Sequence, residues 1–192
     1  MNYKRLEMYL WWTCNNKCLF CIEMKTMEKM WNKIITNSEV LKTLIKYKKQ
    51  WYNHVTYLGG EPFIQKNFWF ALKVWKKLWY TIMVTTNWNL IQFDNIAKKR
   101  LPYIDDLIIS IPIIDKKLQP IINNTKAIID FDDVFINIKK YWKWKFLKVN
   151  TVLNPLNIDY IYDIVKFLIK YDVKSCHLLI QILIYIDMIE II

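Results

Sequence analysis

The sequence predicts an α/β fold, namely a partial, open (β/α)6 barrel with parallel strands. Short β-rich runs alternate with amphipathic helical stretches, which is typical of βαβ units and a parallel sheet. A complete eight-unit barrel takes about 250 residues, or roughly 31 per unit, so a chain of this length supplies about six units. No linker or repeat marks a domain boundary within the 192 residues. We therefore expect residues 1–192 to form one core domain.

The first half of the chain supplies three strands and two helices. β-branched and aromatic residues concentrate in three runs, and apolar residues recur at helical spacing between them. Asn37 or Ser38 is expected as the N-cap of the first helix, because short polar side chains favour that position. The expected elements are, in order, a strand over 6–12, a helix over 38–49, a strand over 54–58, a helix over 67–78 and a strand over 80–86.

The second half repeats the alternation. Apolar residues from Ile161 to Leu168 recur at helical spacing and predict a helix between the last two strands. The expected elements are strands over 107–111, 146–153 and 176–184 and a helix over 159–170. The apolar run 177–192 contains Asp187 and Glu190 and falls short of the ~20 residues that a membrane span needs. A buried strand, or a core truncated at its C-terminal end, is expected there.

The composition restricts the classes of function. The net charge is +11, but Arg5 and Arg100 are the chain's two arginines, so lysine carries nearly all of the positive charge. Arginine is the residue that reads bases and phosphates in bidentate fashion, so nucleic-acid binding is not favoured. No signal peptide or membrane span is visible, and we expect a cytoplasmic protein. In a reducing compartment, clustered cysteines are more often metal ligands than disulfides.

The unusual residues follow the predicted strands. Three cysteines follow the first strand, the sequence GGEP (residues 59–62) follows the second and Thr86-Asn87 ends the third. Ser110 and Asn150 lie on the fourth and fifth strands. Because the loops after the C-terminal strand ends form the active face of such sheets, we expect these residues to meet on one rim.

Cys14, Cys18 and Cys21 have the spacing C-x3-C-x2-C within the cysteine loop (residues 13–21). A ferredoxin-type cubane takes four thiolates, so this loop can hold three irons and leave the fourth open. Zinc is the alternative, but zinc sites usually combine two ligand pairs, and His54 and His177 are isolated. The spacing therefore favours an iron–sulfur cluster with one open iron.

These motifs resemble those of the radical S-adenosylmethionine (radical SAM) superfamily. The resemblance rests on CNNKCLFC after a first strand, YLGGEP after a second and VTTNWNL after a third, and it extends through LIISI and LKVNTVLN. It implies a [4Fe–4S] cluster whose open iron binds the amine and carboxylate of SAM. An electron then splits SAM into methionine and a 5′-deoxyadenosyl radical, which abstracts hydrogen from a substrate. The cofactor carries the difficult chemistry and the protein supplies position and shelter.

The resemblance also implies roles for single residues. Phe20 would lie against the SAM adenine, Glu61 would fix its loop, and a side chain at Gly60 would crowd the methionyl group. Each residue has a plainer alternative. Phe20 could pack in the core, and the glycines could form only a tight turn. Thr86 and Asn87 could cap a strand end, and Ser110 could hydrogen-bond to the backbone. The residues implied to contact SAM or substrate are Phe20, Gly59, Gly60, Glu61, Pro62, Thr86, Asn87, Ser110, Lys148 and Asn150.

The substrate is not readable from these motifs. A peptide or small metabolite is favoured over RNA, and an electron donor such as flavodoxin or ferredoxin is the expected protein partner. A non-catalytic iron–sulfur or electron-transfer protein is the alternative function, but such a protein needs no GGEP segment. Cys176 stands apart from the cluster motif and is expected to pack in the core.

The tryptophans form a last anomaly. The chain has ten Trp and two Gly, although a usual ~7% glycine content would give about 13. Five tryptophans stand where glycine suits a helix end or a turn, namely Trp51, Trp79, Trp88, Trp142 and Trp144. One hypothesis is that many of these residues are glycine in the organism, encoded by a reassigned UGA codon. Chance and an aromatic-rich core are the alternative.

Overall fold

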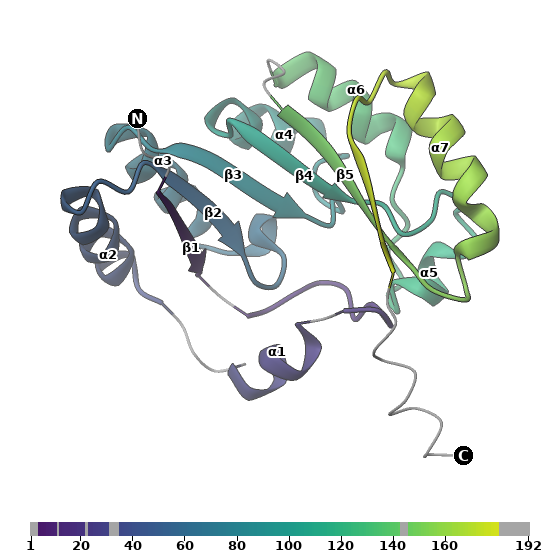
Figure 1. Cartoon of the computed structure of the whole chain (residues 1–192), viewed down its shortest axis with the longest axis horizontal. Helices are drawn as coiled ribbons and strands as arrows, with labels where there is room; N and C mark the ends of the chain where they lie inside the picture. The colour runs from purple at the N-terminus through teal and green to yellow at the C-terminus, as the bar shows by residue number, and fades with distance from the viewer. Residues whose placement is uncertain (1–3, 11, 22, 31–34, 143–145, 181–192) are drawn as a thin grey trace.

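The computed structural model describes residues 4–10, 12–21, 23–30, 35–142 and 146–180. Six parallel strands form one sheet in sequence order, and β1 and β6 lie at its two edges (Figure 1). The described strands leave the sheet open, which confirms the predicted partial barrel. The strands are β1 (Arg5–Tyr9), β2 (His54–Leu58), β3 (Thr81–Thr86), β4 (Asp106–Ser110), β5 (Phe146–Leu153) and β6 (Cys176–Ile180).

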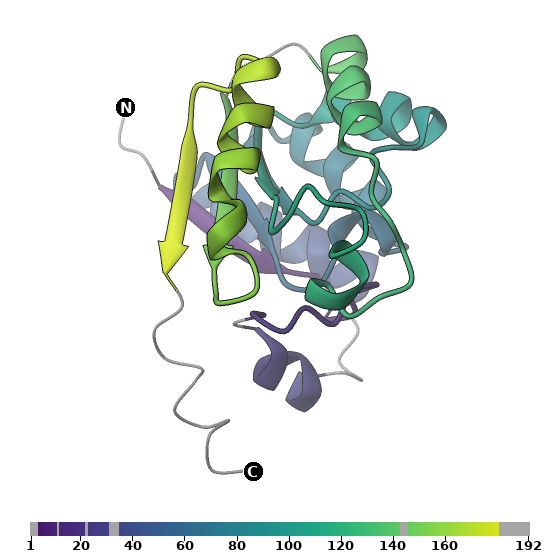
Figure 2. The ribbon, with the colours of Figure 1, turned by 90° about the vertical axis from the view of Figure 1, so that its right-hand side faces the viewer.

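Helices connect successive strands and cover one face of the sheet, as Figures 1 and 2 show from two sides. The buried core lies between these helices and that face, where alternate strand residues such as Tyr57, Val84 and Ile109 are fully buried. Two short helices, α1 and α5, lie instead at the C-terminal end of the sheet. The α-helices are α1 (Met24–Met30), α2 (Asn37–Lys49), α3 (Phe68–Lys77), α4 (Asp94–Arg100), α5 (Gln119–Ile122), α6 (Phe131–Tyr141) and α7 (Ile161–Lys170).

Three one-turn 3-10 helices complete the described elements, namely η1 (Pro62–Ile64), η2 (Leu101–Tyr103) and η3 (Ile158–Tyr160). The expected helix over 159–170 is therefore divided, because its first residues belong to η3. The first strand ends at Tyr9 rather than at residue 12, and β6 is described only to Ile180. The remainder of the expected strand 176–184 lies outside the described residues.

The expected N-cap of α2 was wrong by one or two positions. Thr36, rather than Asn37 or Ser38, has the extended backbone of a cap, and its hydroxyl accepts a hydrogen bond from Glu39 N at 3.2 Å. Glu39 Oε2 accepts in turn from Thr36 N at 2.8 Å, which completes a capping box. The reciprocal bond fixes the start of the helix one residue earlier than the polar pattern suggested.

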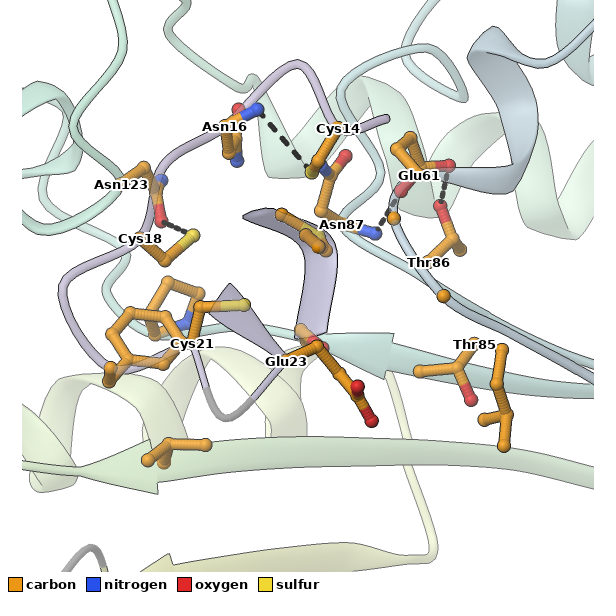
Figure 3. Close-up of a pocket in the computed structure, with 18 of the residues that line it drawn as sticks. Cys14, Asn16, Cys18, Cys21, Glu23, Glu61, Thr85, Thr86, Asn87 and Asn123 are labelled. Carbon is orange, nitrogen blue, oxygen red and sulfur yellow. Dashed lines mark hydrogen bonds between the residues drawn. The ribbon is translucent and has the colours of Figure 1, made fainter. Parts of the chain in front are cut away.

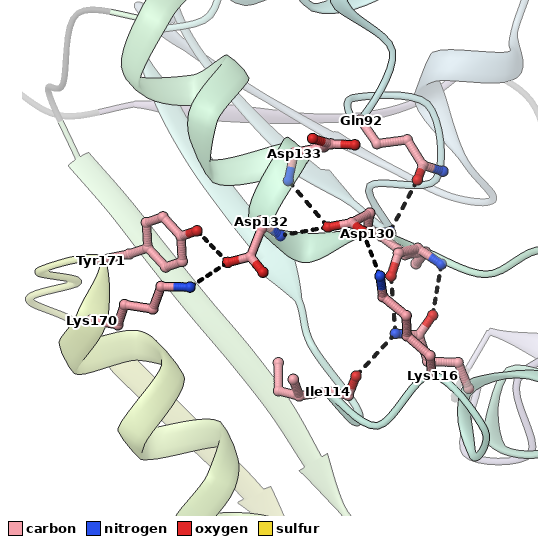
Figure 4. A network of polar contacts seen from close by, with 10 residues as sticks. Gln92, Ile114, Lys116, Asp130, Asp132, Asp133, Lys170 and Tyr171 are labelled. Carbon is pink, nitrogen blue, oxygen red and sulfur yellow. Dashed lines mark hydrogen bonds and ion pairs between the residues drawn. The ribbon is translucent and has the colours of Figure 1, made fainter.

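A polar network joins the N-terminus of α6 to its neighbours (Figure 4). Asp130 caps α6 by accepting from two backbone N–H groups, and it also pairs with Lys116 from the segment before α5. Asp132 accepts from Lys170 Nζ at 2.7 Å and from the Tyr171 hydroxyl. These contacts connect the start of α6 with the end of α7 and with the loop between β4 and α5.

None of the described helices is long and apolar enough to cross a membrane.

Candidate active site

A cavity of about 340 Å³ opens where the strands end, and Figure 3 shows the side chains around it. Its volume lies at the lower end of the range for small-molecule sites. The cysteine loop, the GGEP segment and the ends of β3 and β4 all contribute to its wall. The predicted residues that line it are Cys14, Cys18, Phe20, Cys21, Gly59, Gly60, Glu61, Thr86, Asn87 and Ser110.

The three motif cysteines are unpaired and half-buried, and all face this cavity. Burial raises the pKa of Cys14 and of Cys18 to about 12, so the thiols are protonated until a metal displaces the protons. Among the described residues, no three His, Cys, Asp or Glu side chains converge on one ion position. Structural zinc sites usually combine two ligand pairs, whereas a cubane presents a different iron to each of three cysteines. The donor set fits the cluster.

Amide groups surround the cysteines. Asn16 N donates to Cys14 Sγ at 3.4 Å, and Asn87 Nδ2 donates to the same sulfur at 3.5 Å. The Cys18 thiol donates to Asn123 Oδ1 at 3.6 Å (Figure 3). Asn123 stands at the end of α5, whose backbone also accepts from the cysteine loop, since Lys17 N donates to Asn123 O at 3.1 Å. The loop is thus held by residues from two distant elements.

The GGEP segment contacts the cysteine loop directly. Glu61 N donates to Thr13 O at 2.9 Å. A Cβ atom built on Gly60 would lie 1.9 Å from the same carbonyl oxygen, which is far inside van der Waals contact. Gly59 has a φ of 112°, a conformation that L side chains rarely adopt. Gly59 therefore allows the positive φ, and Gly60 allows the backbone of the GGEP segment to approach that of Thr13. A side chain at position 60 would crowd the Thr13 backbone before it crowded a ligand.

Glu61 links the ends of two strands. Its carboxylate is almost completely buried, and it accepts from Phe63 N at 2.9 Å, from the Thr86 hydroxyl at 2.7 Å and from Asn87 N at 2.7 Å. Burial raises the pKa of Glu61 to about 7, although these hydrogen bonds and the nearby Arg100 act to lower it. Arg100 also donates to the carbonyl of Phe63 in the next turn. The role expected for Glu61, fixing the loop, agrees with this geometry.

The remaining predicted residues divide into two groups. Phe20 packs with Ile113 and Ile122 beside the cavity, and Pro62 begins η1. Asn150 is paired with Ser110 in the sheet, and its buried Oδ1 has no hydrogen-bond partner among the described residues. Lys148 and Asn150 are not among the residues that line the described cavity. They lie nearer the start of β5 than Val152, which does line it.

Cys176 is exposed on the edge strand β6, so its expected place in the core is wrong. The polar residues that sequence reasoning missed are Asn16, Glu23, Thr85 and Asn123, which line the cavity, and Arg100, which lies near Glu61. Asn16 lies inside the cysteine motif and could have been found there, because its backbone N–H faces a ligand sulfur. Asn123 and Arg100 carry no local signal, since Asn123 lies 105 residues from Cys18 in the sequence.

The model of the Radical SAM superfamily matches residues 11–168. The chain belongs to the radical SAM superfamily. Membership implies a [4Fe–4S] cluster and SAM as cofactors, and the three cavity cysteines are the residues that would hold the cluster. The family match also confirms the resemblance that the sequence motifs predicted.

Two curated relatives of this radical SAM chain are named S-adenosylmethionine-dependent nucleotide dehydratases. The protein from Lacinutrix mariniflava is 28% identical over 162 residues, which are 79% of this chain and 33% of that protein. The protein from Flammeovirga pacifica is 24% identical over 163 residues, which are 80% of this chain and 55% of that protein. The chain therefore spans between about a third and about half of the relatives it matches.

Solved structures of radical SAM proteins share the fold. Streptococcus suis SuiB bound to S-adenosylmethionine has a TM-score of 0.69 at 20% identity, over 93% of this chain and 39% of SuiB. Native anSMEcpe with bound AdoMet has a TM-score of 0.68 at 19% identity, over 93% of this chain and 51% of that chain. At these identities the likeness concerns the fold.

Proposed function

We propose that this chain is the catalytic core of a radical SAM enzyme that begins its reaction by abstracting a hydrogen atom from a small metabolite. The observation that carries the proposal is the cavity in which three free thiols face the GGEP segment. In such a site the cluster and SAM together supply the 5′-deoxyadenosyl radical. The protein's own residues hold, orient and shield these groups.

Each residue has a defined part in the proposal. Cys14, Cys18 and Cys21 would hold the cluster, and the cavity that they line would take SAM beside it. Glu61 holds the ends of β2 and β3 together, so that the GGEP backbone keeps its place beside the cysteine loop. The apolar wall formed by Phe20, Ile129 and Val152 excludes water from the reacting centre.

Two further polar groups, on β4 and β5, favour the binding of a ligand at the cavity. Ser110 lines the cavity, and the unpartnered Asn150 Oδ1 is a buried acceptor beside it in the sheet. A buried polar atom without a partner costs free energy, which a ligand donor would recover. We propose that Ser110 and Asn150 face SAM or substrate, with Lys148 two residues before Asn150 in β5.

Anaerobic reconstitution followed by a SAM cleavage assay tests the core proposal. The wild type should take up one [4Fe–4S] cluster per chain and form methionine and 5′-deoxyadenosine in the presence of a reductant. Cys14→Ala, Cys18→Ala and Cys21→Ala should each lose the cluster and the cleavage, whereas Cys176→Ala should keep both. A wild type that binds a cluster without cleaving SAM would instead support a non-catalytic iron–sulfur protein.

A nucleotide is the proposed substrate class. The two curated relatives carry a nucleotide dehydratase name, whereas the peptide-bound structural neighbour, SuiB with precursor peptide SuiA, shares only 21% identity. The test incubates the reconstituted protein with each ribonucleotide and follows 5′-deoxyadenosine together with loss of water from the nucleotide. Stimulation by a peptide and by none of the nucleotides would contradict this choice.

An electron donor such as flavodoxin or ferredoxin is the proposed protein partner. Either reduced protein should replace a chemical reductant in the cleavage assay. Failure of both donors, with cleavage retained under dithionite, would contradict the proposal.

A further inference from the structure

We propose that Asn87 and Asn123 set the reduction potential of the cluster by hydrogen bonding to the sulfurs of two of its cysteine ligands. This inference rests on the proposed function only in requiring that the cluster assembles. It concerns two positioning residues from separate elements, since Asn87 follows β3 and Asn123 ends α5.

The contacts are already formed around the thiols. Asn87 Nδ2 lies 3.5 Å from Cys14 Sγ, and its other polar atom accepts from Asn89 N at 3.2 Å, which holds the amide in this orientation. Cys18 Sγ lies 3.6 Å from Asn123 Oδ1, and the Asn123 side chain is 2% exposed. Asn87 Nδ2 also donates to Asn15 Oδ1 at 2.9 Å, so the amide is held beside the cysteine loop by both of its polar atoms.

Cluster binding changes what the sulfurs require. A thiol donates a hydrogen bond, whereas a cluster-bound thiolate can only accept one. The Asn123 amide therefore turns about its terminal bond and presents Nδ2 at the position of Oδ1. A donor to a cluster sulfur stabilises the more negative, reduced cluster, so it raises the reduction potential.

Redox titration of the reconstituted protein, followed by EPR in the absence of SAM, tests this role. Asn87→Leu and Asn123→Leu should each make reduction about tenfold less favourable, which corresponds to a potential 59 mV more negative for one electron. Asn95→Leu, an exposed change on α4, is the control and should leave the potential unchanged.

The outcomes separate this inference from the proposed function. A wild type without a cluster refutes the proposed function, whereas variants that hold a cluster at the wild-type potential refute the amide role. If one variant takes up no iron, the other decides, because the two contact different cysteines. If both fold but take up no iron, the amides are needed for assembly and the potential-setting role is overturned.

A second, independent observation concerns backbone angles. Among the described residues, five non-glycine residues have a positive φ, and three of them are tryptophans: Trp51 at 68°, Trp79 at 58° and Trp88 at 68°. This region is disfavoured for any residue with a Cβ, and it is where glycine is usual. We infer that positions 51, 79 and 88 are glycine in the organism, encoded by UGA codons that have been read as Trp.

Trp51 and Trp79 occupy the position at helix ends where glycine is most enriched. After α2, Trp51 N donates to Lys48 O at 3.0 Å and Tyr52 N donates to Tyr47 O at 3.1 Å. After α3, Trp79 N donates to Lys76 O at 3.1 Å and Tyr80 N donates to Trp75 O at 3.1 Å. Both pairs form the Schellman motif, whose C′ residue is usually glycine. The two indoles are 82% and 86% exposed, so they gain nothing from burial.

Trp88 differs because it is fully buried, and its indole Nε1 has no partner among the described residues. It follows Asn87 in the turn after β3, where a glycine would remove both the strained angle and the unpaired donor. Trp142, in contrast, has a φ of −115° and donates to Ile104 O at 2.8 Å, so the structure gives no reason for a glycine there. Trp144 lies outside the described residues.

The gene and the native protein decide the matter. UGA at the three codons, with glycine found at these positions by mass spectrometry of the native protein, is the expected result. UGG codons, or UGA codons with tryptophan in the native peptide, would refute the inference.

Stability provides a second readout. Trp51→Gly and Trp79→Gly should each shift the unfolding equilibrium about fivefold to thirtyfold toward the native state. Trp69→Gly, within α3 at an edge-to-face contact with Tyr103, is the control and should shift it the other way. Equal destabilisation by all three changes would show that the left-handed tryptophans carry no strain.

Discussion

Replacing Gly60 by alanine tests how the GGEP segment supports the site. The added Cβ would lie 1.9 Å from Thr13 O and 2.4 Å from Thr13 C, so the Thr13 backbone must move. An ordinary contact between such atoms is about 3.5 Å, which requires a displacement of roughly 1.5 Å. Thr13 precedes Cys14, so the movement reaches the first cluster ligand.

The cost of this change follows from two contributions. Overpacking against a backbone group costs about 1–3 kcal/mol, and the hydrogen bond from Glu61 N to Thr13 O contributes about 1 kcal/mol more when it is lost. We therefore expect Gly60→Ala to lower the free energy of unfolding of the apoprotein by about 2–4 kcal/mol. Iron uptake should fall with it.

Urea unfolding and iron content after anaerobic reconstitution measure the two effects. Thr13→Ala is the matched control, because it removes the side chain and keeps the carbonyl, and it should retain its iron. The reasoning fails if Gly60→Ala keeps wild-type stability and iron content while its affinity for SAM falls. That result would mean that the Cβ crowds the ligand, as the sequence alone suggested, and not the cysteine loop.

Three further predictions follow from named contacts. Burial raises the pKa of Glu61 from its ordinary value of 4.5 to about 7, so the stability it contributes is full below the ordinary value and is lost as the pH rises through about 7. Urea unfolding of the apoprotein between about pH 5 and about pH 8 should show this loss, and Glu61→Gln should remove it; an unchanged pH dependence would contradict the assignment. Arg100→Leu removes a donor to Phe63 O and a cation over the Phe63 ring, and it should cost about 1–3 kcal/mol in the same assay. Thr36→Ala breaks the capping box of α2 and should cost about 1 kcal/mol while leaving iron uptake unchanged, so a loss of iron would show that α2 positions the site.

The fold was predictable because each unit carries its own signal. The strands 54–58 and 146–153 have the predicted bounds, since a polar residue precedes each β-rich run and Gly59 or Asn154 follows it. Helices α1, α4, α5 and α6 were not assigned, although the alternation required helices between the strands. The polar network at Asp130 shows why the start of α6 is hard to predict. The Asp130 side chain pairs with Lys116, and Asp130 N donates to Gln92 Oε1, so both partners of the cap precede the helix by more than ten residues.

The site was predictable to the extent that its residues lie next to one another in the chain. Cys14, Cys18 and Cys21 share one loop, and Glu61 belongs to a four-residue motif. Asn123 reaches Cys18 only because α5 is brought beside the cysteine loop, and neither the spacing nor the composition encodes that contact. Sequence patterns therefore predict the ligands better than the residues that orient them.

The cysteine loop also depends on contacts outside itself. It forms no strand or helix in residues 13–21, and its backbone is held mainly by bonds to other segments, namely Glu61 N to Thr13 O, Lys17 N to Asn123 O and Leu19 N to Ile122 O. A cluster bound by the three cysteines would hold the loop in addition to these hydrogen bonds. Because a ligand that binds only the native state adds its binding free energy to the free energy of unfolding, the cluster would stabilise the protein. Changes at Gly60 or Asn123 should therefore affect the apoprotein and the loaded protein unequally. Comparing the two forms of each variant separates a residue that holds the loop from one that acts on the cluster.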